Sequence, residues 1–222
     1  MSRSRKSALT AALAVTLAVT GAGTTAAAEG AGNPDLTRLV EAVGEVLGDG
    51  GLGGGDRLVW GGRTFLPPAG AASRDAVVYD EGLVPSGASA RVTQVNTRQG
   101  MEIALSVRGF LGDRSYGARV HTRPCGTQPG DSGPRYQDVQ DPRTPSTDPR
   151  YANPDNEVWL DFTTDGYGRG DAVSAHSWRF RPGGARSVVI HEHPAGHDSA
   201  RTGDTGRRVA CVTVPFSPVE RG

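Results

Sequence analysis

The sequence predicts an all-β domain, built as a sandwich or barrel and preceded by a short helix. Beyond residue 75, apolar and polar residues alternate in short segments, with the two-residue period of strands that bury one face. Turn-forming residues separate these segments, and the chain as a whole contains 32 Gly and 15 Pro. Short strands joined by such turns are typical of sandwiches and barrels.

The first 28 residues have the layout of a secretory signal peptide. A basic start that includes Arg3 and Arg5 precedes an apolar run over residues 8–19, and a small-residue motif ends at Ala28. The apolar run is too short to span a bilayer. We therefore expect cleavage near Ala28 and a secreted, extracellular protein without a membrane span.

Cleavage there would leave one slightly acidic domain. It removes three of the 24 basic residues and none of the 24 acidic ones. This balance gives no reason to expect nucleic acid or an anionic membrane as a partner. About 194 residues remain, which is enough for one well-buried domain and a small appendage.

Residues 29–56 are expected to form a short amphipathic helix followed by a linker. Asn33 is placed to cap the helix, Pro34 lies in its first turn and Gly48 follows its end. Its apolar residues recur at helical spacing: Leu36, Leu39, Val40, Val43, Val46 and Leu47. The glycine-rich segment 48–55 lacks the Gly-Lys-Ser/Thr of a phosphate loop, so it is interpreted as a linker.

Residues 57–222 are expected to form the β domain, with eight strands. The candidate strands are residues 75–80, 89–95, 101–110, 116–122, 157–165, 174–180, 186–193 and 207–216. Two longer connections, 122–157 and 193–207, interrupt the regular spacing. The first is rich in Pro, Asp and Gly, and a connection of that length in a compact domain often carries function.

The two cysteines are far apart in the sequence of this domain. Cys125 follows a predicted strand at the start of the long connection, and Cys211 lies inside the last predicted strand. An even pair in an exported chain favours a disulfide, with two separate thiols as the alternative. A bond between Cys125 and Cys211 would close a long loop, which would stabilise the fold by about 4–5 kcal/mol on the chain-entropy model.

Four separated motifs together resemble the copper/zinc superoxide dismutase family. They are Gly-x-x-x-His-Thr-x-Pro-Cys at 117–125, Gly-Pro-x-Tyr at 133–136, Val-Val-Ile-His-Glu-His at 188–193 and Arg-Val-Ala-Cys at 208–211. The resemblance covers roughly residues 75–216. It implies an eight-stranded Greek-key barrel with a disulfide from the long loop to the last strand.

The resemblance also implies a copper site, of which this chain keeps half. The family holds copper with a His-x-His pair, a histidine that follows the Gly-Pro and bridges to zinc, and a late histidine. The matching positions here are Arg119, His121, Arg135 and His191. The zinc ion would need two further histidines and an aspartate, but residues 137–156 contain no histidine, so zinc is not expected.

The two arginines cannot replace imidazole as ligands. A guanidinium has no lone pair to donate, and its charge repels a cation. We therefore expect at most weak copper binding, with His193 or His197 as replacement ligands beside His121 and His191. The alternative is that His121 and His191 are buried histidines held by hydrogen bonds.

Arg208 matches the arginine that guides the anion in the family, and the resemblance gives it the catalytic role. Together with Arg119 and Arg135 it would form a cluster that favours superoxide or another small anion. The alternative is that carboxylates such as Glu192 or the loop aspartates neutralise these arginines.

Two functions follow from these residues. The first is an exported superoxide dismutase-like protein, in which two of four copper positions are arginine, so the sequence does not favour dismutation. The alternative is a metal-free structural domain, or one that binds an anion or a partner.

Overall fold

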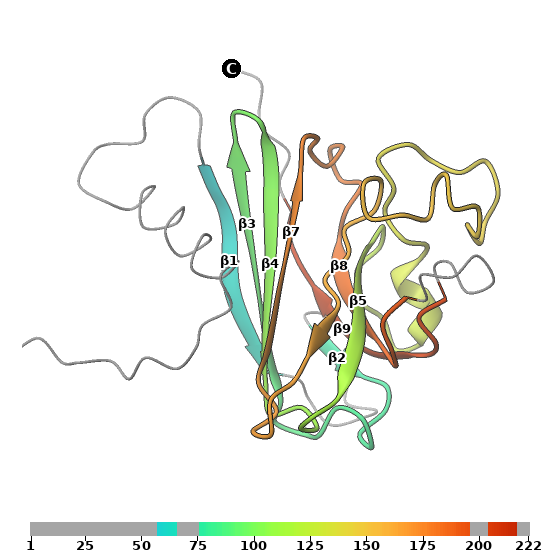
Figure 1. The fold of residues 1–222 in the computed structure, drawn as a ribbon. Coiled ribbons are helices and arrows are strands. Elements are labelled where there is room, and N and C mark those ends of the chain that lie inside the picture. Colours follow the sequence, from blue (N-terminus) through green and yellow to red (C-terminus); the bar gives the residue numbers. More distant parts are fainter. Residues whose placement is uncertain (1–56, 66–75, 196–203, 217–222) are drawn as a thin grey trace, which may run out of the picture. The chain divides into compact units, whose positions relative to one another are not determined.

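The computed structural model describes residues 57–65, of which only the backbone is considered, and residues 76–195 and 204–216. This part of the chain forms nine strands and one short 3-10 helix. The strands form two antiparallel sheets (Figure 1), which confirms the predicted all-β class. The predicted signal peptide, helix and glycine-rich linker lie outside the described residues. None of the described helices is long and apolar enough to cross a membrane.

The first sheet has four strands, ordered β1-β3-β4-β7. Their bounds are β1 Arg57–Phe65, β3 Ser89–Thr97, β4 Gly100–Arg108 and β7 Gly170–His176. The second sheet has five strands, ordered β2-β9-β8-β5-β6. Their bounds are β2 Ala76–Val78, β9 Arg208–Thr213, β8 Ser187–His191, β5 Ser115–His121 and β6 Phe162–Thr163.

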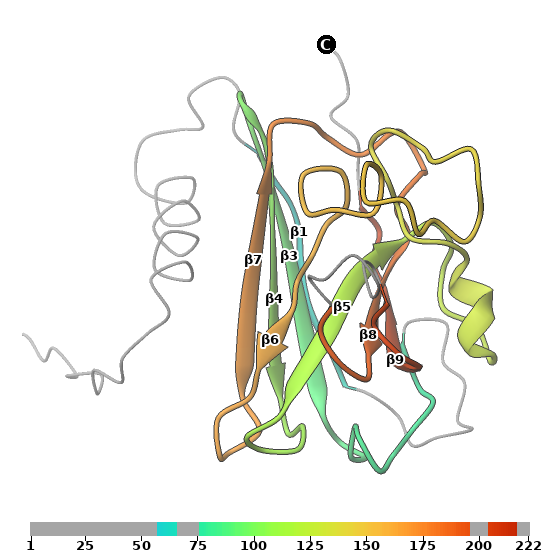
Figure 2. The ribbon, with the colours of Figure 1, turned by 45° about the vertical axis from the view of Figure 1, so that its right-hand side comes forward.

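Several paired strands are distant in the sequence. β4 pairs with β7, and β5 pairs with β8, although in each pair the chain visits the other sheet in between. Connections of this kind, which return a strand beside a distant neighbour, are those of a Greek-key sandwich. Figure 2 shows β7, β4 and β3 in one layer and β5, β8 and β9 in the other.

The hydrophobic core lies between the two sheets. Ala118 and Val120 of β5 belong to this core, and so do Val188 and Ile190 of β8. Their partners from the first sheet include Leu105, which is fully buried. Each large aliphatic side chain buried in this way contributes about 1.5–3 kcal/mol relative to exposure.

Three strand predictions were wrong in extent or missing. β1 was not expected, because Gly61 and Gly62 interrupt its alternation and glycine lowers strand propensity. The segment 157–165 pairs as a strand only at Phe162 and Thr163. β7 spans Gly170–His176, whereas the sequence predicted a strand over residues 174–180. The small residues of β7 pair with β4, and the aromatic segment that follows packs at the edge of the core.

The long connection between β5 and β6 covers the outer face of β5. It leaves β5 after His121, forms the 3-10 helix η1 (Pro129–Ser132) and returns beside the strand. The Tyr136 amide donates to the Val120 carbonyl at 2.8 Å, and the Leu160 amide donates to the Ala118 carbonyl at 2.9 Å. These bonds extend the edge of β5. Residues on both faces of the strand are buried from Tyr116 to His121, although the sandwich has one hydrophobic core.

Candidate functional site

Arg119, His121 and His191 lie together on the covered outer face of the second sheet. Arg119 and His121 are two residues apart on β5, so their side chains leave the strand on the same side, opposite to Ala118 and Val120. His191 ends β8, opposite Gly117 of β5. All three are buried, with exposed fractions of 0%, 0% and 5%.

The two histidines form a close pair with one ring nitrogen each left over. Their ring centroids are 5.6 Å apart and the ring planes differ by 27°. Nδ1 of His121 lies 2.9 Å from the Gly133 carbonyl oxygen, and Nδ1 of His191 lies 2.8 Å from Oγ1 of Thr205. Neither Nε2 atom has a hydrogen-bond partner among the described residues, although both are buried.

Both imidazoles are held in the neutral form. Burial lowers the pKa of His121 well below its usual value, and the nearby Arg208 guanidinium lowers it further. Burial lowers the pKa of His191 to about 3, with Arg119 as the second cause. The surroundings therefore disfavour additional positive charge at this pair.

Arg119 is bound by groups of its own and does not line the cavity described below. Its guanidinium forms a bidentate ion pair with Asp161, with NH2 and Oδ2 3.0 Å apart, and it also donates to the Ala118 carbonyl. The Trp159 ring lies 4.2 Å from the guanidinium carbon. Burial lowers the pKa of Arg119 from its ordinary value, and the hydrogen bond with Asp161 opposes this.

Arg135 has a weaker ion pair in the same loop. Its NH1 lies 3.4 Å from Oε2 of Glu157, which is only 1% exposed. Glu157 also accepts hydrogen bonds from Gln137 Nε2 at 2.8 Å and from Trp159 Nε1 at 3.0 Å. These contacts satisfy the buried carboxylate and tie the returning half of the loop together.

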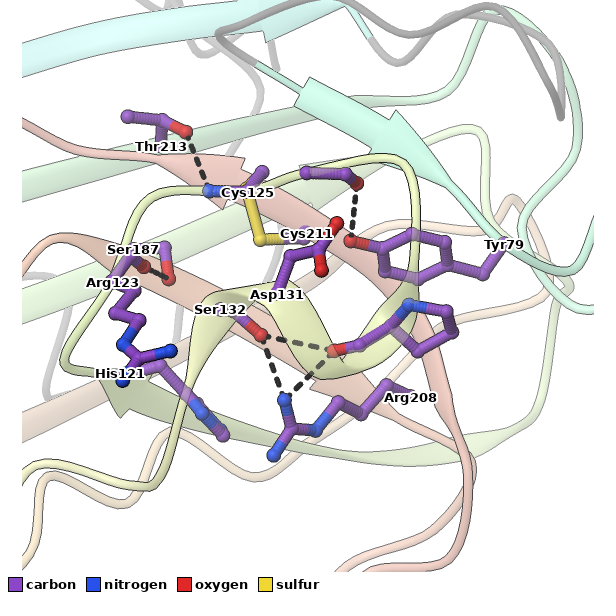
Figure 3. The surroundings of a disulfide bond; sticks show 12 residues. Tyr79, His121, Arg123, Cys125, Asp131, Ser132, Ser187, Arg208, Cys211 and Thr213 are labelled. Carbon is purple, nitrogen blue, oxygen red and sulfur yellow. Dashed lines mark hydrogen bonds between the residues drawn. A yellow bond between two sulfur atoms is a disulfide. The ribbon is translucent and has the colours of Figure 1, made fainter.

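Arg208 is bound only by neutral groups. It donates to the carbonyls of Pro129 at 2.7 Å and Gly133 at 2.9 Å and to Oγ of Ser132 at 2.8 Å. Figure 3 shows its guanidinium beside η1, close to His121. In the described part of the chain Arg208 has no carboxylate within ion-pair distance, so its charge is not neutralised.

The disulfide predicted from the sequence is confirmed. Cys125 and Cys211 are bonded, with their Cα atoms 5.7 Å apart, and the bond joins the start of the loop to the middle of β9. The Cys125 amide donates to Oγ1 of Thr213 at 3.0 Å (Figure 3). The bond thus fixes η1 over β9, where Arg208 can reach it.

Gly133 connects His121 with Arg208. Its carbonyl accepts from both side chains, and its φ of 73° belongs to the left-handed region that favours glycine. A Cβ atom at this position would lie 2.8 Å from Oγ1 of Thr122. Glycine is therefore needed for the loop to present this carbonyl to both groups.

A cavity of about 450 Å³ lies beside the histidine pair. Its charged and titratable lining residues, among those described, are His121, His191, Arg135, Arg143, Arg208 and Asp204. Three of these carry a positive charge and one a negative charge. The structure therefore brings together four of the residues singled out from the sequence: His121, His191, Arg135 and Arg208. Arg119 does not line the cavity.

Of the two proposed replacement ligands, the structure places only His193, and it does not join this group. His193 is exposed, its Nδ1 lies 2.9 Å from the Pro194 carbonyl oxygen, and it is not among the cavity-lining residues. His197 lies outside the described residues.

The residues present do not fit the copper and zinc ions that the sequence resemblance implies. Within the described ranges, no group of three or more His, Cys, Asp and Glu could hold a metal ion. The two free imidazole nitrogens fall short of the donor set that cupric copper prefers. The cationic Arg119 and Arg208 lower the pKa of His191, and the same field opposes a bound cation.

Sequence reasoning missed the partners of the arginines. It considered Glu192 and the aspartates between 138 and 155, whereas the structure pairs Arg119 with Asp161 and Arg135 with Glu157. Thr205, the partner of His191, was also missed. The available signal was that Glu157 and Asp161 both lie in a segment predicted as a strand, where a carboxylate needs a partner if it is buried.

Comparisons with known proteins concern the fold. No protein-family model and no curated protein sequence matches the chain. Copper/zinc superoxide dismutase from Brucella abortus is a structural neighbour at 14% identity and a TM-score of 0.43, covering 72% of this chain and 99% of that one. A SOD-like protein from Bacillus subtilis is 13% identical, covering 63% and 95% of the two chains, with a TM-score of 0.41.

Proposed function

We propose that this chain is an exported protein related to the copper/zinc superoxide dismutases, and that its pocket binds a small anion without dismutating superoxide. The observation that carries this proposal is the charge of the cavity lining. Arg135, Arg143 and Arg208 face one carboxylate, Asp204, among the described lining residues. Guanidinium groups are the side chains best suited to bind oxyanions.

The charge on the cavity is only partly cancelled by neighbours. Arg208 donates to two carbonyls and a hydroxyl, and neither it nor Arg143 forms an ion pair within the described ranges. Arg135 keeps a partner, Glu157, but at 3.4 Å. In a partly enclosed site, unpaired guanidinium groups attract a small anion strongly.

The relationship to the dismutases rests on the sequence motifs and on how the chain connects them. The motifs around His121 and Gly133 adjoin the cavity, and the late motif contributes His191. The disulfide joins the first motif to the last, at Cys125 and Cys211. The signal peptide expected from the sequence agrees with a disulfide-bonded protein.

Dismutation is the competing function, and the donor set argues against it. A redox copper needs several nitrogen donors, and this chain offers two neutral imidazoles beside the guanidiniums of Arg119 and Arg208. After copper loading and removal of free metal, we expect superoxide consumption no faster than that of a metal-free control protein. Rapid consumption with stoichiometric copper would show that the proposed function is wrong.

Anion binding is tested by calorimetric titration with inorganic phosphate in a buffer without coordinating anions. Arg143→Gln removes a cavity charge at an exposed position, and Arg208→Gln removes one at a half-buried position. We expect each change to weaken binding by about 10- to 100-fold, the range for one charged hydrogen bond. Arg150→Gln is the matched control, because Arg150 is exposed, pairs with Asp148 and does not line the cavity. Equal affinities in all four proteins would contradict the proposal.

A further inference from the structure

The cavity presents two opposite kinds of hydrogen-bonding group. Arg135, Arg143 and Arg208 can only donate, because a guanidinium has no acceptor. His121 behaves differently, because its Nδ1 lies 2.9 Å from the Gly133 carbonyl oxygen. A carbonyl only accepts, so the imidazole proton must be on Nδ1, and Nε2 carries a lone pair.

The lone pair of His121 is fixed by its surroundings. His121 is 0% exposed, and its Nε2 has no hydrogen-bond partner among the described residues. Arg208 donates to the same Gly133 carbonyl, so its positive charge lies close to the ring. His121 therefore offers an acceptor to whatever occupies the cavity.

His191 lacks this fixed polarity. Its Nδ1 lies 2.8 Å from the Thr205 hydroxyl, which can either donate or accept. If Thr205 donates, Nε2 of His191 carries the proton, and if Thr205 accepts, Nε2 carries the lone pair. The His191–Thr205 hydrogen bond can therefore adapt to a ligand that either donates or accepts. Only His121 requires that the ligand donate a hydrogen bond.

An anion that only accepts hydrogen bonds does not satisfy this cavity. Sulfate would meet the arginines well but would leave the lone pair of His121 facing its own oxygen lone pairs. An oxyanion that keeps a proton satisfies both groups, since its charged oxygens accept from the arginines and its hydroxyl donates to Nε2. A site with a buried hydrogen-bonding group rejects ligands that lack the complementary group.

We infer that the cavity selects oxyanions that carry a hydroxyl proton, of the hydrogen phosphate or hydroxycarboxylate type, over aprotic anions of the same size and charge. This inference rests on the proposed anion binding and specifies its ligand. Arg143 and Arg208 bind the charged oxygens, and His121 accepts the hydroxyl proton. The cavity of about 450 Å³ has room for either type.

The test compares matched anions on the metal-free protein by calorimetry at pH 7.5 and constant ionic strength. Inorganic phosphate is compared with sulfate, and lactate with propionate. In at least one pair we expect the hydroxyl-bearing anion to bind about 10- to 100-fold more tightly than its aprotic partner. The pair that shows this preference identifies the ligand as an inorganic or an organic oxyanion. Binding without preference in both pairs overturns this inference and leaves anion binding intact. No binding by any of the four anions overturns the proposed function itself.

His121→Phe tests the residue, since it keeps a ring but removes the acceptor. We expect the preference within the discriminating pair to fall to about threefold or less. His176→Phe is the control, because His176 stacks on Trp178 and does not line the cavity. If His121→Phe does not fold, nitrogen NMR of the parent protein decides the matter: a proton on Nδ1 of His121 supports the inference, and a proton on Nε2 overturns it.

Discussion

Arg119 is buried at a position where the strand could have presented a small or apolar side chain. Taking a guanidinium out of water is costly unless its hydrogen bonds are replaced. Here Asp161 and the Ala118 carbonyl replace them, and the Trp159 ring covers the guanidinium face. The cationic side chain therefore acts as a cross-link between β5 and the returning loop.

Replacing Arg119 with methionine should destabilise the protein by about 2–4 kcal/mol, because Asp161 would lose its partner while remaining partly buried. The value lies below the upper limit for buried pairs, since the Asp161 side chain keeps an exposed fraction of 23%. Urea unfolding measures this change. The control is Arg150→Met, which breaks an exposed pair with Asp148 and should leave the free energy of unfolding nearly unchanged. Similar effects for both variants would contradict a structural role for Arg119.

The double change Arg119→His and Arg135→His should create a copper site. It removes two positive charges, supplies two imidazoles near His121 and His191, and leaves the carboxylates of Asp161 and Glu157 without their cations. We expect copper affinity to rise by at least about 100-fold, with smaller gains for either single change. Titration followed by the visible absorption of cupric copper measures it.

His121→Ala in the double variant is the control for that gain, because it should abolish most of it. A folded double variant that binds copper no better than the parent would show that these positions do not converge on one site.

At the scale of elements, the loop between β5 and β6 depends on contacts at both of its ends. The disulfide of Cys125 fixes its start to β9, and backbone hydrogen bonds of Tyr136 and Leu160 return it to β5. η1 lies between these points, and its Pro129 and the following Gly133 provide the carbonyls that bind Arg208. The geometry of the cavity is thus set by how the loop is attached.

Replacing Cys125 and Cys211 with serine should destabilise the protein by about 2–5 kcal/mol, because the bond closes a long loop in the unfolded chain. We also expect limited proteolysis to cut between residues 122 and 135 sooner than in the parent, since η1 loses its attachment to β9. Urea unfolding and mass spectrometry of the fragments measure the two effects. Unchanged stability together with unchanged cleavage sites would contradict this role for the disulfide.

The aromatic segment after β7 explains why one strand was placed four residues too late. Trp178 and Phe180 have high strand propensity, so the pattern favoured them over the small residues that precede them. In the structure, β7 uses Gly170–His176 to pair with β4, while Phe180 packs 4.8 Å from Phe216, measured between ring centroids. Propensity located the segment, but the pairing with β4 decided its boundaries.

At the scale of the whole molecule, the buried histidines make stability depend on pH. Burial lowers the pKa of His121 well below its usual value, that of His191 to about 3 and that of His176 to about 4. These side chains are neutral in the folded protein but bind protons in the unfolded chain below about pH 6.5. The unfolded state therefore gains stability as the pH falls through this range.

Between pH 6 and pH 5 we expect the free energy of unfolding to fall by about 2–3 kcal/mol, mainly from His121 and His191. It should be nearly constant from pH 7 to pH 8, because these histidines are neutral in both states there. His191→Gln should reduce the slope between pH 6 and pH 5 by about half. Urea unfolding at each pH measures this, and a parent protein as stable at pH 5 as at pH 7 would contradict the burial of neutral histidines.

The sequence by itself determined the fold class, most of the strands and the disulfide. A two-residue alternation of apolar and polar residues marked most of the strands, including the one that carries Arg119 and His121. An even pair of cysteines in a chain with an expected signal peptide was enough to predict the bond between Cys125 and Cys211. Each of these inferences depends on local spacing or on composition, which a sequence displays directly.

Only the tertiary structure decided what the site residues contact. Asp161 lies 42 residues from Arg119, and Arg208 lies 75 residues from the Gly133 carbonyl that it shares with His121. No local pattern encodes such contacts, because they depend on which strands pair and on where a loop without regular structure returns to the sheet. The same contacts fix the proton on Nδ1 of His121 and bind Arg119 outside the cavity, so the chemistry of the site follows from the fold.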